Sequence, residues 1–234
     1  MKQIVALGGG GFLMEPRNPL LDDFVLSIAR GAESRVCFLA TASGDADRNL
    51  VNFYTDLAPR CRATHLPLFR RTHDDLDALL GEQDIIYVGG GNTANMLAVW
   101  RTHGVDLALQ HAYEAGVVMA GVSAGALCWF EGGVTDSFGR LARLDDGLGL
   151  LSGTMCPHYD GEAERRPAYH RLIAQGMPAG FAADDGAALH FVDGALREVV
   201  SSRPAARAYR VEREGDGVDE RALAARFLGV SAEM

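Results

Sequence analysis

The feature that most constrains this chain is a short apolar run that ends in a serine set between small residues. Residues 117–122 read VVMAGV and lead directly into Ser123. An unbroken apolar run of this length predicts a strand buried on both faces of a parallel sheet. The small, apolar residues 124–129 predict that a helix starts immediately after the serine. The sequence therefore indicates a sharp strand–turn–helix with Ser123 at its apex.

Residues 121–125, GVSAG, fit the G-x-S-x-G pattern of a nucleophile elbow. Small neighbours let the backbone turn sharply, so that the Ser123 hydroxyl projects from the carboxyl edge of the sheet. The N–H groups at the start of the following helix favour a developing negative charge there. The same pentapeptide also occurs by chance as a turn without chemistry, so the rest of the chain must decide between the two interpretations.

The first half of the chain alternates between apolar runs and helical patterns. We expect an Asn18 cap and Pro19 at the first helical position of the first helix, and an edge location for the strand that contains Pro67. This alternation predicts an α/β fold with a doubly wound, mostly parallel sheet and helices on both faces. The expected strands are 4–7, 35–41, 64–68, 85–88 and 117–122. The expected helices are 19–30, one that carries Leu50, Phe53, Tyr54 and Leu57, and 74–80, 94–101 and 106–115.

The pattern changes after residue 129. Turn-rich sequence with little periodicity continues to a predicted helix at 162–175, followed by a strand, an acidic turn and a strand over 181–191. Residues 196–201 and 207–213 are expected to form a terminal hairpin or edge pair, and 219–228 a closing helix. Because no internal repeat or linker interrupts the chain, we expect one domain spanning residues 1–234.

Composition excludes several classes of function. The chain has 234 residues, a formal net charge of −9 and a pI of about 5.2, which argue against nucleic acid or an anionic membrane as partner. No apolar segment approaches the roughly 20 residues that span a bilayer, and the N-terminus does not resemble a signal peptide. The four scattered cysteines indicate neither disulfides nor zinc. We expect a cytoplasmic protein.

A serine nucleophile needs a base and an orienting acid. His158 is the favoured base because it follows a proline in an irregular stretch, whereas surface exposure or packing explains the other histidines. The acid is open among Asp136, Asp160, Asp184 and Asp185. Metal binding by the last two ranks low, because no ligand cluster lies near them in the sequence. The order serine, histidine, acid differs from that of the α/β-hydrolases.

Four motifs together resemble the peptidase E family of α-aspartyl dipeptidases, which has cyanophycinase as a relative. They are VGGGNT at 88–93, GVSAGA at 121–126, the Pro157-His158 pair, and the acidic residue before Gly186. The resemblance preserves motif order over essentially the whole chain. It implies a flavodoxin-like sheet related to the class I glutamine amidotransferases.

Carried over by position, the resemblance makes Ser123 the nucleophile, His158 the general base and Asp185 the acid, although peptidase E has glutamate there. It places the oxyanion hole at the Gly91 and Ala124 N–H groups. The implied substrate-binding residues are Arg166, which would bind the aspartyl carboxylate, together with Gly90 and Asn92.

The resemblance therefore implies a serine exopeptidase for short peptides with a possible preference for N-terminal aspartate, as a monomer or homodimer without metal or organic cofactor. The stretch 135–138 departs from the dipeptidase pattern and puts strict Asp-X specificity in question. A broader aminopeptidase, a cyanophycinase-like peptidase and a catalytically silent binding module remain alternatives. A thiol enzyme using Cys128 is disfavoured because that residue falls in the predicted helix.

Overall fold

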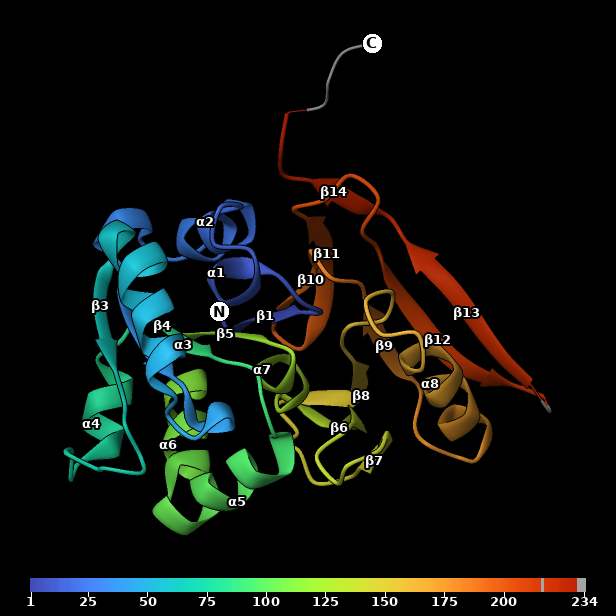
Figure 1. The fold of residues 1–234 in the computed structure, drawn as a ribbon, viewed down its shortest axis with the longest axis horizontal. Helices are drawn as coiled ribbons and strands as arrows, with labels where there is room; N and C mark the ends of the chain where they lie inside the picture. Colours follow the sequence, from blue (N-terminus) through green and yellow to red (C-terminus); the bar gives the residue numbers. More distant parts are fainter. Residues whose placement is uncertain (216, 231–234) are drawn as a thin grey trace.

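A computed structural model describes residues 1–215 and 217–230, which form two β-sheets with helices packed against them (Figure 1). The eight-stranded sheet has the order β14-β11-β10-β1-β5-β4-β2-β3 and the six-stranded sheet the order β13-β12-β9-β8-β6-β7. The first consists of β1 (Gln3–Leu7), β2 (Arg35–Leu39), β3 (Arg62–His65), β4 (Ile85–Val88), β5 (Val118–Val122), β10 (Ala187–Val192), β11 (Ala195–Ser201) and β14 (Ala225–Phe227). The second consists of β6 (Phe130–Thr135), β7 (Ala142–Leu144), β8 (Leu151–Cys156), β9 (Gly180–Ala183), β12 (Ala208–Glu214) and β13 (Gly217–Leu223).

The first sheet confirms the doubly wound α/β prediction. Its strands β1, β5, β4, β2 and β3 are parallel neighbours, and β10 joins β1 antiparallel. Side chains alternate between the two faces: Val5 and Leu7 pack in one apolar cluster, and Ile4 and Ala6 in another. Helices α1 (Gly11–Met14), α2 (Leu20–Ser27) and α3 (Asp47–Asn52) lie on the first face, and α4 (Leu76–Gly81), α5 (Thr93–His103) and α6 (Val105–Glu114) on the second.

The second sheet was not predicted. Only its β6–β8 and β8–β9 pairs are parallel, and helix α8 (Arg165–Ala174) packs against it (Figure 1). Its strands contain glycines where the backbones approach closely: a Cβ on Gly133 would lie 2.1 Å from the Met155 carbonyl oxygen. Glycines in these strands interrupt the alternation of apolar and polar residues that identifies a strand. The sequence pattern therefore gives little indication of strands in this region.

Two predictions for the C-terminal region are wrong. Residues 219–228 are not a helix, because β13 and β14 occupy this segment. The predicted pairing of 196–201 with 207–213 does not occur either. The two strands exist, but β11 pairs with β10 and β14 in the first sheet, whereas β12 pairs with β9 and β13 in the second.

Three local predictions also need correction. Asn18 does not cap α2; its side chain donates a hydrogen bond to the Ser202 carbonyl, and Pro19 occupies the cap position. The helix after Ser123 is only α7 (Ala124–Leu127), because β6 begins three residues later. Strand β3 lies at the edge of its sheet, as predicted, but it ends at His65, so Pro67 lies beyond it.

A buried carboxylate lies beneath the loop that follows β1. The side chain of Asp22 on α2 is 1% exposed, accepts a hydrogen bond from the Tyr87 hydroxyl (3.2 Å) and lies 3.6 Å from the Arg60 guanidinium. A Cβ on Gly11 would lie 2.9 Å from the Asp22 carboxylate, so the loop rests directly on it. Burial raises the pKa of Asp22 to about 7, although Arg60 and Tyr87 oppose the shift.

The raised pKa of Asp22 predicts a pH-dependent stability. The native state binds a proton more readily than the unfolded chain, so the free energy of unfolding should fall as the pH rises from about 4 to about 7. Asp22→Asn should remove this slope. We expect the thermal midpoint of the wild type to fall relative to that of Asp22→Asn by a few degrees between about pH 4.5 and 7.5. Asp23→Asn, an exposed neighbour that also pairs with Arg60, is the control, and parallel curves for wild type and Asp22→Asn would contradict the prediction.

Candidate active site

The predicted catalytic residues converge at the carboxyl end of β1. Three successive carbonyl groups there accept hydrogen bonds from three distant segments: Leu7 from the Ser123 N–H (3.1 Å), Gly8 from the His158 N–H (3.1 Å) and Gly9 from the Gly186 N–H (3.0 Å). Ser123 follows β5, His158 lies just beyond β8, and Gly186 adjoins Asp185 between β9 and β10. The junction of the two sheets therefore brings the three predicted triad residues to one strand end.

Ser123 has the geometry of a nucleophile elbow. Its φ of 58° and ψ of −114° place a non-glycine residue in a strained region of backbone space. The small residues around it are required by close approach: a Cβ on Gly121 would lie 2.1 Å from the Gly125 carbonyl oxygen, and one on Gly125 would lie 2.2 Å from the Val88 carbonyl oxygen. The G-x-S-x-G sequence is thus explained by packing between β4, β5 and α7.

The acid closest to the histidine is Asp185. Its Oδ1 lies 2.7 Å from His158 Nδ1, and the two side chains are 15% and 12% exposed. The Asp185 N–H donates to Asp160 (2.8 Å), so Asp160 orients the backbone of the acid. Asp136 instead lies 3.8 Å from Arg165. Of the four candidate acids, Asp185 is therefore the one that contacts the imidazole.

Asp184 points away from the histidine into a separate buried site. Its Oδ2 accepts hydrogen bonds from the Arg207 N–H (2.9 Å) and the Tyr209 hydroxyl (3.4 Å). Burial raises the pKa of Asp184 to about 6, against the effect of the Arg207 hydrogen bond. The two adjacent carboxylates therefore have different surroundings, as expected for neighbours whose side chains face opposite sides.

The hydrogen bond with Asp185 leaves His158 Nε2 as the nitrogen that can accept a proton, because the carboxylate takes the Nδ1 proton. Among residues 1–215 and 217–230, no hydrogen bond joins the Ser123 hydroxyl to the imidazole. Catalytic hydrogen bonds are often long or misaligned before substrate binds. Ser123 and His158 are connected here through their backbones to adjacent carbonyls of the β1 loop.

The glycine loop after β4 lies beside the serine. A Cβ on Gly90 would be 3.2 Å from Ser123 Cβ. The N–H groups of Gly89 and Asn92 already donate to the carbonyls of Leu39 and Ala42, so of the loop amides those of Gly90 and Gly91 are the candidates for an oxyanion hole. Gly91 has a φ of 142°, and a Cβ there would lie 2.2 Å from the Ala42 carbonyl oxygen, so only glycine fits. The role of the Ala124 N–H stays a prediction.

Both polar atoms of the Asn92 side-chain amide make hydrogen bonds within the protein. Its Oδ1 accepts from the Asn95 N–H and caps α5, while its Nδ2 donates to the Ser137 carbonyl (3.0 Å). Ser137 Oγ also accepts from the Ala94 N–H (3.1 Å). The stretch 135–138, which departs from the dipeptidase pattern, therefore packs on the predicted oxyanion loop. A substrate-binding role for Asn92 stays a prediction, and any direct contact must compete with these bonds.

The predicted substrate-binding Arg166 and its neighbour Arg165 have different partners. Arg165 is buried and donates to the Val134 carbonyl (3.1 Å) and to Glu162 (2.7 Å), so it joins α8 to the second sheet. Arg166 is half exposed, and its Nε and Nη2 donate to Glu220 on β13. Asp160 was among the candidate acids, but its contact with the Asp185 backbone was not predicted, and neither was any role for Glu220, because their partners are distant in the chain.

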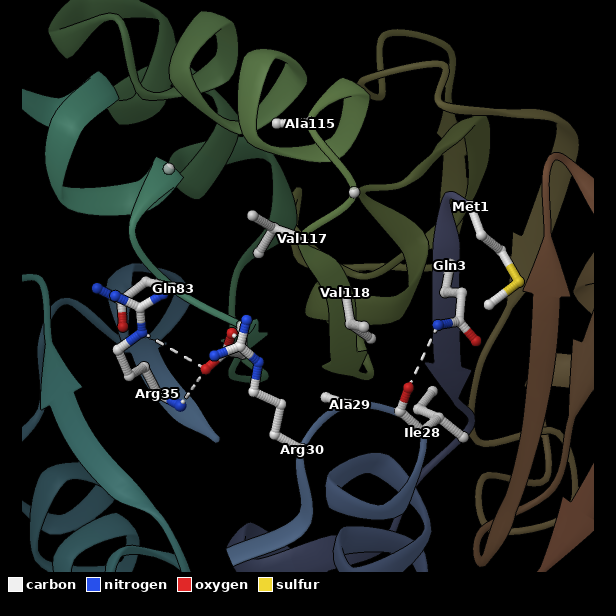
Figure 2. A pocket seen from close by; sticks show the side chains of 13 residues that line it. Met1, Gln3, Ile28, Ala29, Arg30, Arg35, Gln83, Ala115, Val117 and Val118 are labelled. Carbon is white, nitrogen blue, oxygen red and sulfur yellow. Dashed lines mark hydrogen bonds and ion pairs between the residues drawn. The ribbon is translucent and has the colours of Figure 1, made fainter. Parts of the chain in front are cut away.

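A separate cavity of about 440 Å³ lies at the opposite, amino edge of the first sheet (Figure 2). Its lining includes Arg30 and Arg35, whose guanidinium groups lie 3.3 and 3.5 Å from the Asp84 carboxylate. Gln3 on its wall donates to the Ile28 carbonyl (3.4 Å). Because none of the predicted site residues line this cavity, it is not the candidate active site.

Two further observations concern the described ranges 1–215 and 217–230. They contain no group of three or more histidine, cysteine, aspartate or glutamate side chains arranged to hold a metal ion. Within them, no helix has both the length and the apolar character that crossing a membrane requires.

The fold and the serine elbow at its sheet edge are those expected of a serine-type peptidase. The profile of peptidase family S51 matches residues 4–199, and the chain belongs to this family. It is 51% identical over 231 residues to the uncharacterized peptidase YgaJ of Bacillus subtilis (strain 168), covering 98% of this chain and 100% of the relative.

Two solved structures share the fold. A peptidase from an acI-B1 Actinobacterium superposes with a TM-score of 0.69 at 17% identity, covering 96% of this chain and 95% of the other. A putative peptidase E protein from Listeria monocytogenes EGD-e superposes with a TM-score of 0.57 at 16% identity, covering 96% and 100%. These comparisons confirm the predicted fold and the resemblance to the peptidase E family.

The β1 loop yields a sharp test of the site. A Cβ on Gly9 would lie 1.9 Å from Asp185 Oδ1 and 3.0 Å from His158 Nδ1, so Gly9→Ala should push the acid away from the imidazole. We expect kcat to fall by about two orders of magnitude or more, with a thermal midpoint near that of wild type. Gly81→Ala, where the added methyl meets nothing within 4 Å, is the matched control. Full activity in Gly9→Ala would show that the Asp185–His158 contact is dispensable.

Proposed function

We propose that this peptidase is a serine exopeptidase that removes N-terminal residues from short peptides through Ser123, His158 and Asp185. The observation that carries this proposal is the attachment of the strained serine and the paired histidine to successive carbonyls of one strand end. A glycine-rich turn without chemistry would not need a buried carboxylate–imidazole pair beside it.

In the proposed mechanism, Ser123 Oγ attacks the scissile carbonyl while His158 Nε2 takes its proton. Asp185 keeps the imidazole in the tautomer that leaves Nε2 free and stabilises the imidazolium that forms. The same proton then passes to the leaving amine, and the peptide bond breaks to give an acyl-enzyme. Water, activated by His158, attacks the ester and releases the N-terminal residue with Ser123 regenerated.

The negative charge that develops on the carbonyl oxygen would be stabilised by the N–H groups of Gly91 and Ala124. Such a donor is worth on the order of 3 kcal/mol of transition-state stabilisation in well-studied serine enzymes. The backbone N–H of Asn92 already donates to the Ala42 carbonyl, which supports assigning the oxyanion hole to the N–H of Gly91. The tight packing of Gly91 on Ala42 would hold this donor in place without reorganisation during the reaction.

The proposal is tested by screening Asp-X, Leu-X and Ala-X dipeptides and longer peptides with the wild type and Ser123→Ala. We expect release of free N-terminal residues by the wild type and a loss of about four orders of magnitude in Ser123→Ala, with the thermal midpoint changed little. A serine-directed covalent inhibitor should label Ser123 in the wild type. Activity that survives Ser123→Ala would place the nucleophile elsewhere, and a wild type that is neither active nor labelled would favour the silent binding module.

The preference for N-terminal aspartate is the finer part of the proposal. The resemblance assigns the substrate's second carboxylate to Arg166, which is half exposed on α8, and a guanidinium binds a carboxylate through two parallel N–H bonds that lysine cannot reproduce. A peptidase with broader preference, including a cyanophycinase-like one, is the alternative.

Arg166→Lys should therefore raise KM for Asp-X peptides by about tenfold or more while changing kinetics on Leu-X peptides little, because the lost contact is on the side chain and not on the scissile bond. Initial-rate kinetics on Asp-Ala and Leu-Ala decide the matter. Equal losses on both peptides would remove Arg166 from substrate recognition, and a wild type that prefers neutral residues would exclude the aspartyl preference while leaving the serine mechanism intact.

A further inference from the structure

Glu220 is the centre of a partly buried polar cluster beside the candidate active site. Its side chain is 10% exposed and accepts hydrogen bonds from the Tyr159 hydroxyl, from His170 Nε2 (2.8 Å) and from Arg166. Burial raises the pKa of Glu220, but the hydrogen bonds from Tyr159, His170 and Arg166 outweigh it and leave the pKa below its usual value. A carboxylate with this many donors is held firmly, because displacing it would break three hydrogen bonds at once and leave the buried Tyr159 hydroxyl unpaired.

The Glu220 carboxylate holds one edge of the Arg166 guanidinium. Its Nε and Nη2 donate to the two oxygens of Glu220, whereas Nη1 lies on the other edge of the guanidinium plane. The guanidinium carbon lies 5.5 Å from the centre of the Tyr159 ring and 5.4 Å from that of Tyr209. The Arg166 side chain is 52% exposed, so a ligand from solvent can reach it without moving Glu220.

The two tyrosines connect this arginine to the catalytic residues. Tyr159 follows His158 directly, and its N–H donates to the Ala183 carbonyl (3.1 Å) at the end of β9. The Tyr209 hydroxyl donates to Asp184 (3.4 Å), the residue before Asp185. Arg166 therefore packs over side chains that are anchored next to both the base and the acid of the proposed triad.

We infer that Glu220 is a positioning residue that aims the free edge of Arg166 at a substrate carboxylate on the N-terminal residue. This inference rests on the proposed function and deepens its specificity. Glu220 fixes the orientation of the guanidinium and offsets its charge in the empty site, so that recognition depends on paired hydrogen bonds more than on net charge. A merely structural Glu220–Arg166 pair would affect all substrates alike.

The experiment is steady-state kinetics of Glu220→Gln on Asp-Ala and Leu-Ala, with the full-length protein. Glutamine keeps the size of the side chain but removes the charged partner of Arg166. We expect KM for Asp-Ala to rise about tenfold with kcat nearly unchanged, and kcat/KM for Leu-Ala to stay within about twofold. Arg166→Lys combined with Glu220→Gln should lose little more than Arg166→Lys alone, because both changes remove one interaction.

Glu198→Gln is the matched control. Glu198 on β11 also accepts from the Nε and Nη2 of an arginine, Arg226, but none of the predicted site residues takes part in that pair. It should change neither reaction. If Glu220→Gln fails to fold, Glu220→Asp replaces it, since the shorter side chain withdraws the carboxylate from Arg166 and should give the same selective loss.

The outcomes separate this inference from the proposed function. Equal effects of Glu220→Gln on both peptides, no effect on either, or a wild type that hydrolyses Leu-Ala but not Asp-Ala would overturn the role of Glu220. A wild type that hydrolyses neither peptide counts against the proposed function, and calorimetric titration with succinate then tests Glu220 directly. We expect succinate to bind Glu220→Gln about tenfold more weakly than wild type, and equal binding or no binding to either protein would overturn the inference.

Discussion

The site depends on the carboxyl end of β1, where three peptide carbonyls in a row hold three segments from different parts of the chain. The groups they bind belong to Ser123, to His158 and to the neighbour of Asp185. Backbone hydrogen bonds position the main chain without using any catalytic side chain, so the hydroxyl, imidazole and carboxylate remain available for chemistry. The glycines of this loop are needed because a methyl group at Gly9 would occupy the space of the Asp185 carboxylate.

The two sheets contribute unequally to this arrangement. The first sheet supplies the serine and the glycine loop after β4, both at carboxyl ends of parallel strands, where ligands of open α/β sheets bind. The second sheet supplies the histidine after β8, and the acid lies where the chain passes from β9 back to β10. One apolar cluster contains residues of both sheets. The packing of this core therefore also fixes how the segments that carry the serine, the histidine and the acid are placed relative to one another.

The sequence predicted the parts of this structure that follow from local pattern. Apolar runs such as 117–122 identified the parallel strands, and motif order singled out Ser123, His158 and Asp185. The second sheet was missed because glycines such as Gly133 stand where two backbones approach closely. Such glycines do not contribute to the alternation of apolar and polar residues by which a strand is recognised in a sequence. Residues 219–228 were mistaken for a helix because Leu223, Phe227 and Leu228 are spaced as on a helical face. In the structure this segment forms strands instead, because β13 pairs with β12 and β14 pairs with β11. The Arg166–Glu220 contact spans 54 positions, so no local signal indicates it.

The location of Glu220 on β13 has a consequence for how this family can diversify. Among the described strands of its sheet, β13 is at the edge and bonds to β12, and it lies beyond residues 4–199, where the family profile matches. The serine, histidine and acid all lie inside the matched region. An edge strand tolerates substitution more readily than a central one, since it has a neighbour on one side only. In our proposal, the residues that carry the chemistry and Arg166 therefore lie inside the region that the family profile describes, whereas the residue that positions Arg166 lies outside it.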